Sequence, residues 1–270
     1  MSGFRIPGAL CIEAQPWSIF DGTSALWRGP RPGPVCTEQP SFPLSLIDSG
    51  VSVDPDMVFL FRECLNPKMG LAESDYADAA ATLGVDTATI KAVADVETSG
   101  SAFDSMGRPR ILYERHYFHR QTHGRFDKEH ASISGKTGGG YGKFSAQYGK
   151  LQEAYRLDPD AALSSASWGR FQIMGSNYRA AGFASVRQFV GAMTRSESAH
   201  LTAFVAFVGH DSAMSNALKR RDWAGFARAY NGEGYKKNLY DEKLQIAYER
   251  FAREAAAAAA AKASALGYKP

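Results

Sequence analysis

The chain has 270 residues, 44% of them hydrophobic, and a formal net charge of only +3. A chain of this length and apolar content can bury one large core with an appendage beside it. The small basic excess suits loose contact with an anionic polymer, but it is too weak to predict nucleic-acid binding. We expect no integral membrane segment and no secretory signal, because no long apolar run occurs and Met1 leads into no apolar segment.

The cysteines and prolines are concentrated near the start of the chain. Cys11, Cys36 and Cys64 fit no zinc pattern, and the remainder can fold in a reducing cytoplasm because it has no cysteine. Residues 1–70 also hold nine of the twelve prolines, which favour extended backbone. We expect an irregular N-terminal extension there, partly disordered or wall-binding, with no assigned role.

Helical spacing dominates from about residue 71 onward. The segment 73–83 predicts one helix that ends at Gly84, and Asp86 and Thr87 are candidate N-caps of the next. Further helical patterns resume at 151 and cover 185–208, 213–229 and 238–253, and the alanine run 255–263 can prolong the last helix into solvent. We predict a mainly α-helical domain over 71–255 and an alanine-rich helical tail over 256–270.

The helix that starts near Thr87 carries a carboxylate on its apolar face. Ile90, Val93, Ala94 and Glu97 share that face by spacing, and Gly100 is a natural stop. Burial and the negative end of the helix dipole both raise the pKa of a glutamate there, as a general acid requires. The alternative is an ordinary helix-end glutamate that points to water.

Two later patches combine glycine, aromatic and amide side chains. In residues 165–175, Gly169 allows close backbone approach, and Gln172 can donate and accept hydrogen bonds to an N-acetyl amide or a sugar hydroxyl. In residues 230–235, Tyr230 and Asn231 stand beside glycines. Each patch alone is weak, because such runs more often form core or turns.

Four ordered patches together resemble the N-acetylmuramidase family of phage endolysins, within the lysozyme-like superfamily that includes goose-type lysozymes and lytic transglycosylases. They are Glu-Thr-Ser-Gly at 97–100, Gly-Arg-Pro-Arg-Ile-Leu-Tyr-Glu-Arg-His at 107–116, Ser-Ala-Ser-Trp-Gly-Arg-Phe-Gln-Ile-Met-Gly at 165–175 and Tyr-Asn-Gly-Glu-Gly-Tyr at 230–235. The resemblance implies a lysozyme-like helical fold. It also implies that Glu97 protonates the glycosidic oxygen between N-acetylmuramic acid and N-acetylglucosamine in peptidoglycan. Residues 1–70 do not resemble the wall-binding module that such endolysins often carry.

A two-carboxylate mechanism needs a partner for Glu97. The candidates are Glu114, which can equally form a buried ion pair with its neighbours, and Asp104, which is more often a loop cap. The superfamily also offers routes that use the substrate's acetamido group or its 6-hydroxyl, and the latter gives a lytic transglycosylase. For substrate contacts the resemblance suggests Gln172 and Tyr230, and then Asn231, Trp168 and Tyr235, although Trp168 can equally belong to the core.

A rival metal site needs to be weighed. His116, His119 and His123 share a helical face by spacing, with Asp127 and His130 nearby. We favour a polar helix face whose basic residues touch the anionic wall, and we expect no metal or other cofactor.

The setting suggested by the resemblance is phage lysis. The protein would be a monomer made in the host cytoplasm, released by a holin and active on the periplasmic wall. The alternatives are an interbacterial muramidase toxin, a chitin-cleaving enzyme and a catalytically idle wall-binding protein.

Overall fold

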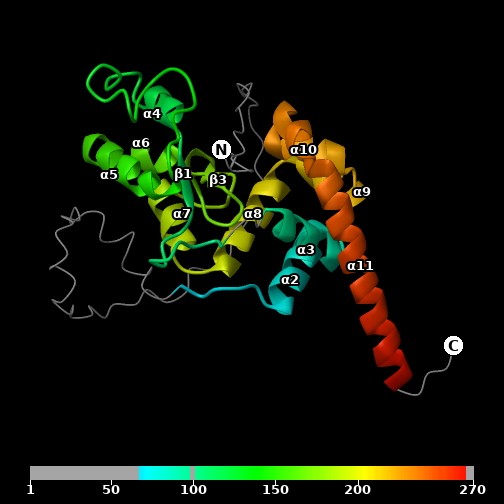
Figure 1. The fold of residues 1–270 in the computed structure, drawn as a ribbon. Coiled ribbons are helices and arrows are strands. Elements are labelled where there is room, and N and C mark those ends of the chain that lie inside the picture. Colours follow the sequence, from blue (N-terminus) through cyan, green and yellow to red (C-terminus); the bar gives the residue numbers. More distant parts are fainter. Residues whose placement is uncertain (1–66, 98–100, 266–270) are drawn as a thin grey trace, which may run out of the picture.

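The computed structural model describes residues 67–97 and 101–265, and the mainly helical prediction is confirmed (Figure 1). The α-helices are α2 (Glu73–Leu83), α3 (Thr87–Val96), α4 (Arg115–Gln121), α5 (Gln147–Leu157), α6 (Pro159–Ser164), α7 (Val186–Met193), α8 (Glu197–His210), α9 (Ser212–Arg220), α10 (Trp223–Asn231) and α11 (Tyr240–Ala265). Short 3-10 turns occupy Phe144–Ala146, Gly175–Asn177 and Glu233–Asn238. The proline-rich extension expected at 1–70 lies outside the described residues up to position 66.

The first two described helices begin and end where their capping residues predict. Gly84 ends α2 in the left-handed conformation, at φ 66°, which costs glycine little. The Asp86 carboxylate then accepts the Thr89 N–H at 2.7 Å and starts α3. Ile90, Val93 and Ala94 are buried, as their shared face predicts. The expected stop at Gly100 lies outside the described residues.

A small antiparallel sheet links the middle of the chain. Strands β1 (Ile111–Tyr113), β2 (Ala166–Trp168) and β3 (Ile173–Met174) lie in that order, with Ile111 opposite Trp168 and Trp168 opposite Ile173. The turn between β2 and β3 contains Gln172. The helical patterns had not predicted this sheet.

Two continuous helical patterns are each broken into two helices. The 185–208 pattern becomes α7 and α8, and the Ser196 hydroxyl accepts the Ala199 N–H at 3.0 Å to start α8. The 213–229 pattern becomes α9 and α10, because Arg221 adopts a left-handed conformation and Asp222 caps the new helix. The helical spacing had shown neither break.

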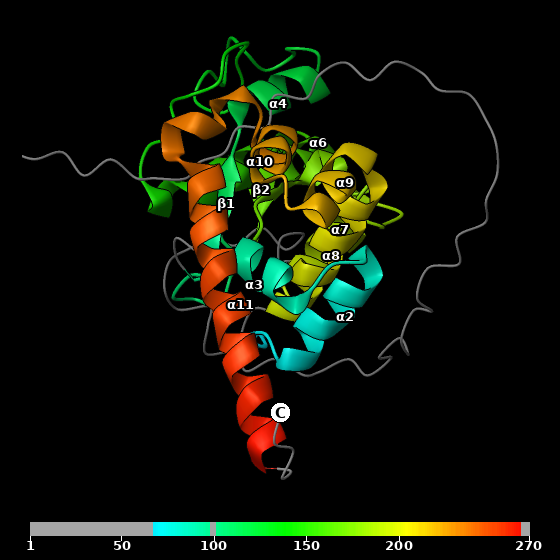
Figure 2. The ribbon, with the colours of Figure 1, turned by 90° about the vertical axis from the view of Figure 1, so that its right-hand side faces the viewer.

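The C-terminal helix packs along α3 and then runs beyond the body of the protein (Figures 1 and 2). Leu244 and Ala247 are buried in this packing, and an Arg250–Asp95 ion pair at 2.9 Å joins the two helices. From Arg253 to Ala265 every residue is exposed. The prediction that the alanine run prolongs the last helix into solvent is confirmed.

The folded region begins before the expected boundary at residue 71. The Lys68 N–H donates to the Arg195 carbonyl at 3.0 Å, and the Gly70 N–H donates to the Glu197 carboxylate at 3.0 Å. Lys68 and Gly70 therefore belong with the helical body. Across residues 67–97 and 101–265, no helix has both the length and the apolar character needed to span a bilayer.

Candidate active site

The catalytic candidate Glu97 is the C-cap residue that directly follows α3, with helical backbone at φ −71° and ψ −16°. The residue as a whole is partly exposed, but protein atoms surround its carboxyl group. Burial raises the pKa of Glu97 to about 7, and a hydrogen bond from the Tyr240 hydroxyl to Oε1 opposes that rise. A carboxyl group with this pKa can donate a proton near neutral pH, as the sequence predicted.

The sequence patterns had not singled out Tyr240. It is the first residue of α11 and is almost completely buried, whereas the preceding Leu239 is exposed. Tyr240, Leu244 and Ala247 recur at helical spacing, and all three are buried. That spacing was the available signal that Tyr240 faces the body of the protein.

Two predicted contact residues lie at the end of α10, next to Tyr240. Tyr230 is buried, and its hydroxyl donates to the Phe171 carbonyl at 2.7 Å. Burial and the charge of Glu97 both raise the pKa of Tyr230, so its hydroxyl lies near the Glu97 carboxylate. Asn231 is 3% exposed and neighbours the Tyr240 hydroxyl, yet within the described part of the chain neither of its amide atoms forms a hydrogen bond of good geometry.

Gln172 lies in the β2–β3 turn and is held there by its own amide. Its Nε2 donates to the Gly169 carbonyl at 2.7 Å, and its Oε1 accepts from the Ser167 hydroxyl at 2.9 Å. Its backbone is left-handed at φ 48°, a conformation that a non-glycine residue rarely adopts and that is often found at functional sites. Because Tyr230 bonds to Phe171 in the same turn, the structure brings Gln172 and α10 together.

The same turn depends on Gly169, as the sequence predicted. Gly169 has φ 69°, and a Cβ at this position would lie 2.7 Å from Cε1 of His200. The next residue, Arg170, donates its backbone N–H to Nδ1 of His200 at 3.0 Å. The turn is thus packed against α8.

Trp168 and Tyr235 are placed in the core. Trp168 is 1% exposed, and its indole N–H donates to the Leu163 carbonyl at 3.0 Å. Tyr235 is also 1% exposed. Neither ring offers a face for a sugar to stack on, so the core alternative describes Trp168, and Tyr235 is likewise a core residue.

The first candidate partner for Glu97, Asp104, is used within its own loop. Its Oδ1 accepts the N–H groups of Met106 and Arg108 at 2.9 and 3.0 Å, and its Oδ2 accepts from the Arg108 guanidinium at 2.7 and 2.6 Å. A carboxylate with these partners is a poor base or nucleophile, because its lone pairs are already engaged. The geometry matches the loop-cap alternative.

The second candidate, Glu114, is 3% exposed at the junction of β1 and α4. Its Oε2 lies 3.1 Å from Nδ1 of His116, and its backbone N–H donates to the Ser165 carbonyl at 2.8 Å. Arg110, whose carbonyl accepts the Gly169 N–H of the β2–β3 turn, lies at the other end of β1. Glu114 comes four positions after Arg110, which is about 13 Å along the strand at the usual rise per residue. The contact with His116 matches the ion-pair alternative.

The histidines proposed for a metal are each paired with a different carboxylate. His119 lies 2.7 Å from Asp127, His130 lies 2.9 Å from Glu153, and His116 faces Glu114. His123 follows the end of α4 in a left-handed conformation, so it leaves the shared helical face. The described residues contain no cluster of three or more metal-binding side chains.

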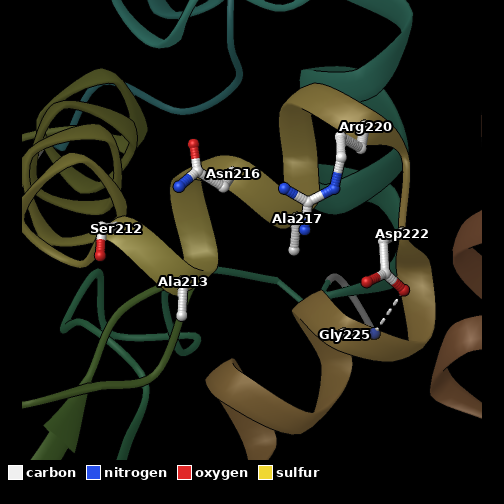
Figure 3. Close-up of a pocket in the computed structure, with 7 residues that line it drawn as sticks. All are labelled: Ser212, Ala213, Asn216, Ala217, Arg220, Asp222 and Gly225. Atoms are coloured by element: carbon white, nitrogen blue, oxygen red, sulfur yellow. Dashed lines mark hydrogen bonds between the residues drawn. The ribbon is translucent and has the colours of Figure 1, made fainter.

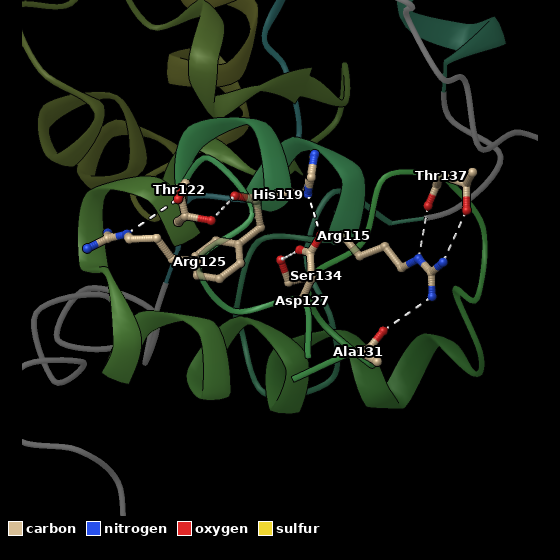
Figure 4. Close-up of polar contacts among 9 residues, drawn as sticks. Arg115, His119, Thr122, Arg125, Asp127, Ala131, Ser134 and Thr137 are labelled. Atoms are coloured by element: carbon tan, nitrogen blue, oxygen red, sulfur yellow. Dashed lines mark hydrogen bonds and ion pairs between the residues drawn. The ribbon is translucent and has the colours of Figure 1, made fainter. Parts of the chain in front are cut away.

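The His119–Asp127 pair and the Arg115 side chain hold the long glycine-rich loop that follows α4 (Figure 4). Asp127 accepts from Ser134 at 2.6 Å as well as contacting His119. The Arg115 guanidinium holds the far part of the loop through the carbonyls of Ala131 and Thr137, at 3.2 and 2.9 Å. The loop is a structured lobe built on local polar contacts.

A cavity of about 260 Å³ lies between α9 and α10 (Figure 3). It is lined by Ser212, Ala213, Asn216, Ala217, Arg220, Asp222 and Gly225. The Asp222 carboxylate there accepts the Gly225 N–H at 2.8 Å and serves as the cap of α10. None of the predicted catalytic or contact residues lines it.

Comparison with known proteins identifies the family. The profile of the N-acetylmuramidase family matches residues 86–252, well over half of the chain. The chain belongs to the N-acetylmuramidase family. The matched region of this muramidase contains Glu97, the β2–β3 turn, α10 and the start of α11.

Solved structures agree with this assignment. The muramidase is similar to the crystal structure of the Burkholderia AP3 phage endolysin, with a TM-score of 0.66 and 41% identity, over 70% of this chain and 73% of that chain. No match was found among curated proteins. The resemblance of the four sequence patches to endolysin muramidases is therefore confirmed.

Proposed function

We propose that this muramidase cleaves the β-1,4 bond between N-acetylmuramic acid and N-acetylglucosamine in peptidoglycan, with Glu97 as the general acid. The observation that carries the proposal is the burial of the Glu97 carboxyl group at the end of α3, with a pKa of about 7. At neutral pH a large fraction of this group holds a proton that it can give to the glycosidic oxygen. The family match supports the same reaction.

The proposed mechanism uses Glu97 as its single carboxylate. Asp104 is bound by Arg108, and Glu114 faces His116, so both carboxylates already have partners and the proposal gives neither a role in the reaction. Glu97 protonates the leaving oxygen as the glycosidic bond breaks. The resulting carboxylate then takes a proton from the incoming nucleophile, which is water in a hydrolase and the 6-hydroxyl of muramic acid in a transglycosylase.

Asn231 is too deeply buried for a direct substrate contact. Its amide lies next to the Tyr240 hydroxyl, so we assign it to the support of that side chain beside Glu97. Gln172 and Tyr230 also shape the site, because their polar atoms already bond to Gly169 and Phe171. No cofactor enters the proposal.

The biological setting that we propose is lysis of a bacterial host by a phage. The similar protein of known structure is named a phage endolysin. The enzyme would act on the periplasmic wall after release through a holin. Clearing of cells only when the enzyme is delivered by a secretion system would instead favour an interbacterial toxin.

Mass spectrometry of the soluble fragments released from purified peptidoglycan tests the reaction. Reducing N-acetylmuramic ends, with the mass of one added water, are expected for a hydrolytic muramidase. Anhydro-muramic ends would identify a lytic transglycosylase, and reducing N-acetylglucosamine ends would place the cut at the other bond. Release of no fragments would overturn the enzymatic proposal and favour a wall-binding protein, and cleavage of chitin at an equal rate would contradict the muramic acid specificity.

A variant without the acidic proton of Glu97 separates its role in the reaction from any role in the fold. Glu97→Gln keeps the shape of the side chain, so we expect it to abolish wall clearing and leave the helical circular dichroism unchanged. Full clearing by this variant would remove Glu97 from the mechanism.

A further inference from the structure

The start of α11 and the end of α3 are joined by a hydrogen bond as well as by packing. The Tyr240 hydroxyl donates to Oε1 of Glu97. The two residues are 143 positions apart in the chain, so the contact exists only because α11 lies along α3. Tyr240 is 4% exposed, so little water competes for the hydrogen bond.

We propose that Tyr240 is a positioning residue that holds Oε1 of Glu97 and thereby leaves Oε2 to carry the proton that is transferred to the glycosidic oxygen. This inference rests on the proposed role of Glu97 as the acid. A phenol has one proton, and here that proton is directed at Oε1. The acidic proton of Glu97 therefore resides on the other oxygen.

The same hydrogen bond acts on both halves of the reaction. When Oε2 loses its proton to the leaving oxygen, Glu97 becomes a carboxylate, and the Tyr240 hydroxyl stabilises that charge. Burial and the charge of Glu97 raise the pKa of Tyr240, so the phenol keeps its own proton throughout. Tyr240 donates a hydrogen bond before and after the transfer without taking part in it.

Replacing the hydroxyl gives two effects that loss of packing does not produce together. In Tyr240→Phe the carboxylate form of Glu97 loses a charge-assisted hydrogen bond. The alkaline limb of the pH profile for kcat should therefore move to higher pH by about one pH unit. The rate at the optimum should fall by about three- to tenfold, because Glu97 is less well oriented. The expected signature is a lower kcat at the optimal pH together with activity that extends to higher pH.

Tyr248 provides a matched control on the same helix. Its hydroxyl contacts Asp86 at 3.1 Å, at the beginning of α3 rather than its end. Tyr248→Phe also removes a hydroxyl contact between α11 and the α3 region. Its Tm can therefore change, but we expect its pH profile for kcat to stay where it is in the parent. An equal movement in both variants would assign the effect to helix packing and overturn the inference.

A direct measurement makes the test independent of activity. The Glu97 carboxyl carbon can be followed by NMR in protein labelled with 13C-glutamate, and it is assigned by its absence in Glu97→Gln. Its titration should move to higher pH in Tyr240→Phe, and an unchanged titration in the folded variant would overturn the role of Tyr240. If Glu97 were not the general acid, the result would be different: Glu97→Gln would still clear the wall.

A second substitution covers the case in which Tyr240→Phe does not fold. Site-specific 3-fluorotyrosine at position 240 keeps the shape of the ring and makes the phenol a stronger donor. The alkaline limb should then move to lower pH, opposite to the direction expected for phenylalanine. No movement with this analogue would also overturn the inference.

Discussion

Arg170 and Glu197 form an ion pair that ties the β2–β3 turn to the start of α8. The guanidinium also donates to the Ala94 carbonyl of α3 at 3.4 Å, and the other carboxylate oxygen accepts the Gly70 N–H at 3.0 Å. The pair therefore joins the segment before α2, the helix that carries Glu97, the turn that carries Gln172, and α8. Both side chains are mostly buried, at 14% and 6% exposed.

Removing Glu197 should be far more costly than removing an exposed partner. Glu197→Ala leaves the Arg170 guanidinium buried without its carboxylate, so we expect the free energy of unfolding to fall by about 3–5 kcal/mol. The control is Glu73→Ala, which breaks the Lys91–Glu73 pair in which Glu73 is 78% exposed, and should cost less than about 1 kcal/mol. Urea denaturation of both variants measures the difference, and equal losses would contradict the structural role of Glu197.

His200 should make the fold sensitive to acid. Its Nε2 lies 2.6 Å from the Met193 carbonyl and its Nδ1 accepts the Arg170 N–H, so the ring is neutral with its proton on Nε2. Burial lowers the pKa of His200 from 6.5 to about 4. The unfolded chain thus binds this proton more readily. The stability due to His200 is complete above pH 6.5 and is lost as the pH falls through 4, by about 3 kcal/mol.

The test compares denaturation of the parent and His200→Gln across this range. The glutamine side chain does not titrate, so the variant should lose less stability than the parent between pH 6.5 and 4. Parallel curves for the two proteins would show that another group controls the acid transition.

Glu97 should have the opposite pH dependence. Its pKa is raised in the folded protein from 4.5 to about 7, so the folded state holds the proton more tightly than the unfolded state. Its contribution to stability is complete below pH 4.5 and is lost as the pH rises through 7, by about 3 kcal/mol at most. Glu97→Gln should therefore be more stable than the parent at pH 8 and similar to it at pH 4. A variant equally stable at both values would contradict the burial of this carboxyl group.

The start of the site was predictable because its determinants are local. The Asp86 cap, the apolar face of α3 and Glu97 at its end all lie within twelve consecutive residues. The Asp104–Arg108 and Glu114–His116 pairs are also local, at spacings of four and two, and the sequence had offered a cap role for Asp104 and, on equal terms with catalysis, an ion pair for Glu114.

Long-range contacts were beyond the reach of the sequence patterns. Tyr240 meets Glu97 through the packing of α11 on α3, and no local spacing indicates that pairing. The strands of two or three residues are too short for an alternating pattern to appear. The break between α7 and α8 was hidden because apolar residues continue on both sides of the Ser196 cap.

Gly175, the last residue of the 165–175 patch, lies where the structure leaves no room for a side chain. A Cβ at this position would lie 2.1 Å from the Leu163 backbone oxygen, whereas a Cβ on Gly149 of α5 would meet no atom within 4 Å. We expect Gly175→Ala to cost about 3 kcal/mol or more, because backbone must move. Gly149→Ala should stabilise the protein by about 0.5–1 kcal/mol, because alanine favours a helix. Thermal denaturation of the two variants should give Tm changes of opposite sign, and a tolerated Gly175→Ala would contradict the close approach to Leu163.

Deleting residues 256–270 should leave both stability and wall clearing unchanged. Within the described residues, the contacts of α11 with the body, among them those of Tyr240, Leu244, Tyr248 and Arg250, all lie before the deletion. Residues 256–265 are exposed, and their helix is sustained by the high helix propensity of alanine rather than by packing. We expect the Tm to stay within about 2 °C of the parent. Deletion from residue 240 onward is the contrasting variant, because it removes Tyr240 and uncovers α3, and it should lose activity. Slower wall clearing with an unchanged Tm in the shorter deletion would show that the exposed tail touches the substrate, and a lower Tm would show that it supports the fold.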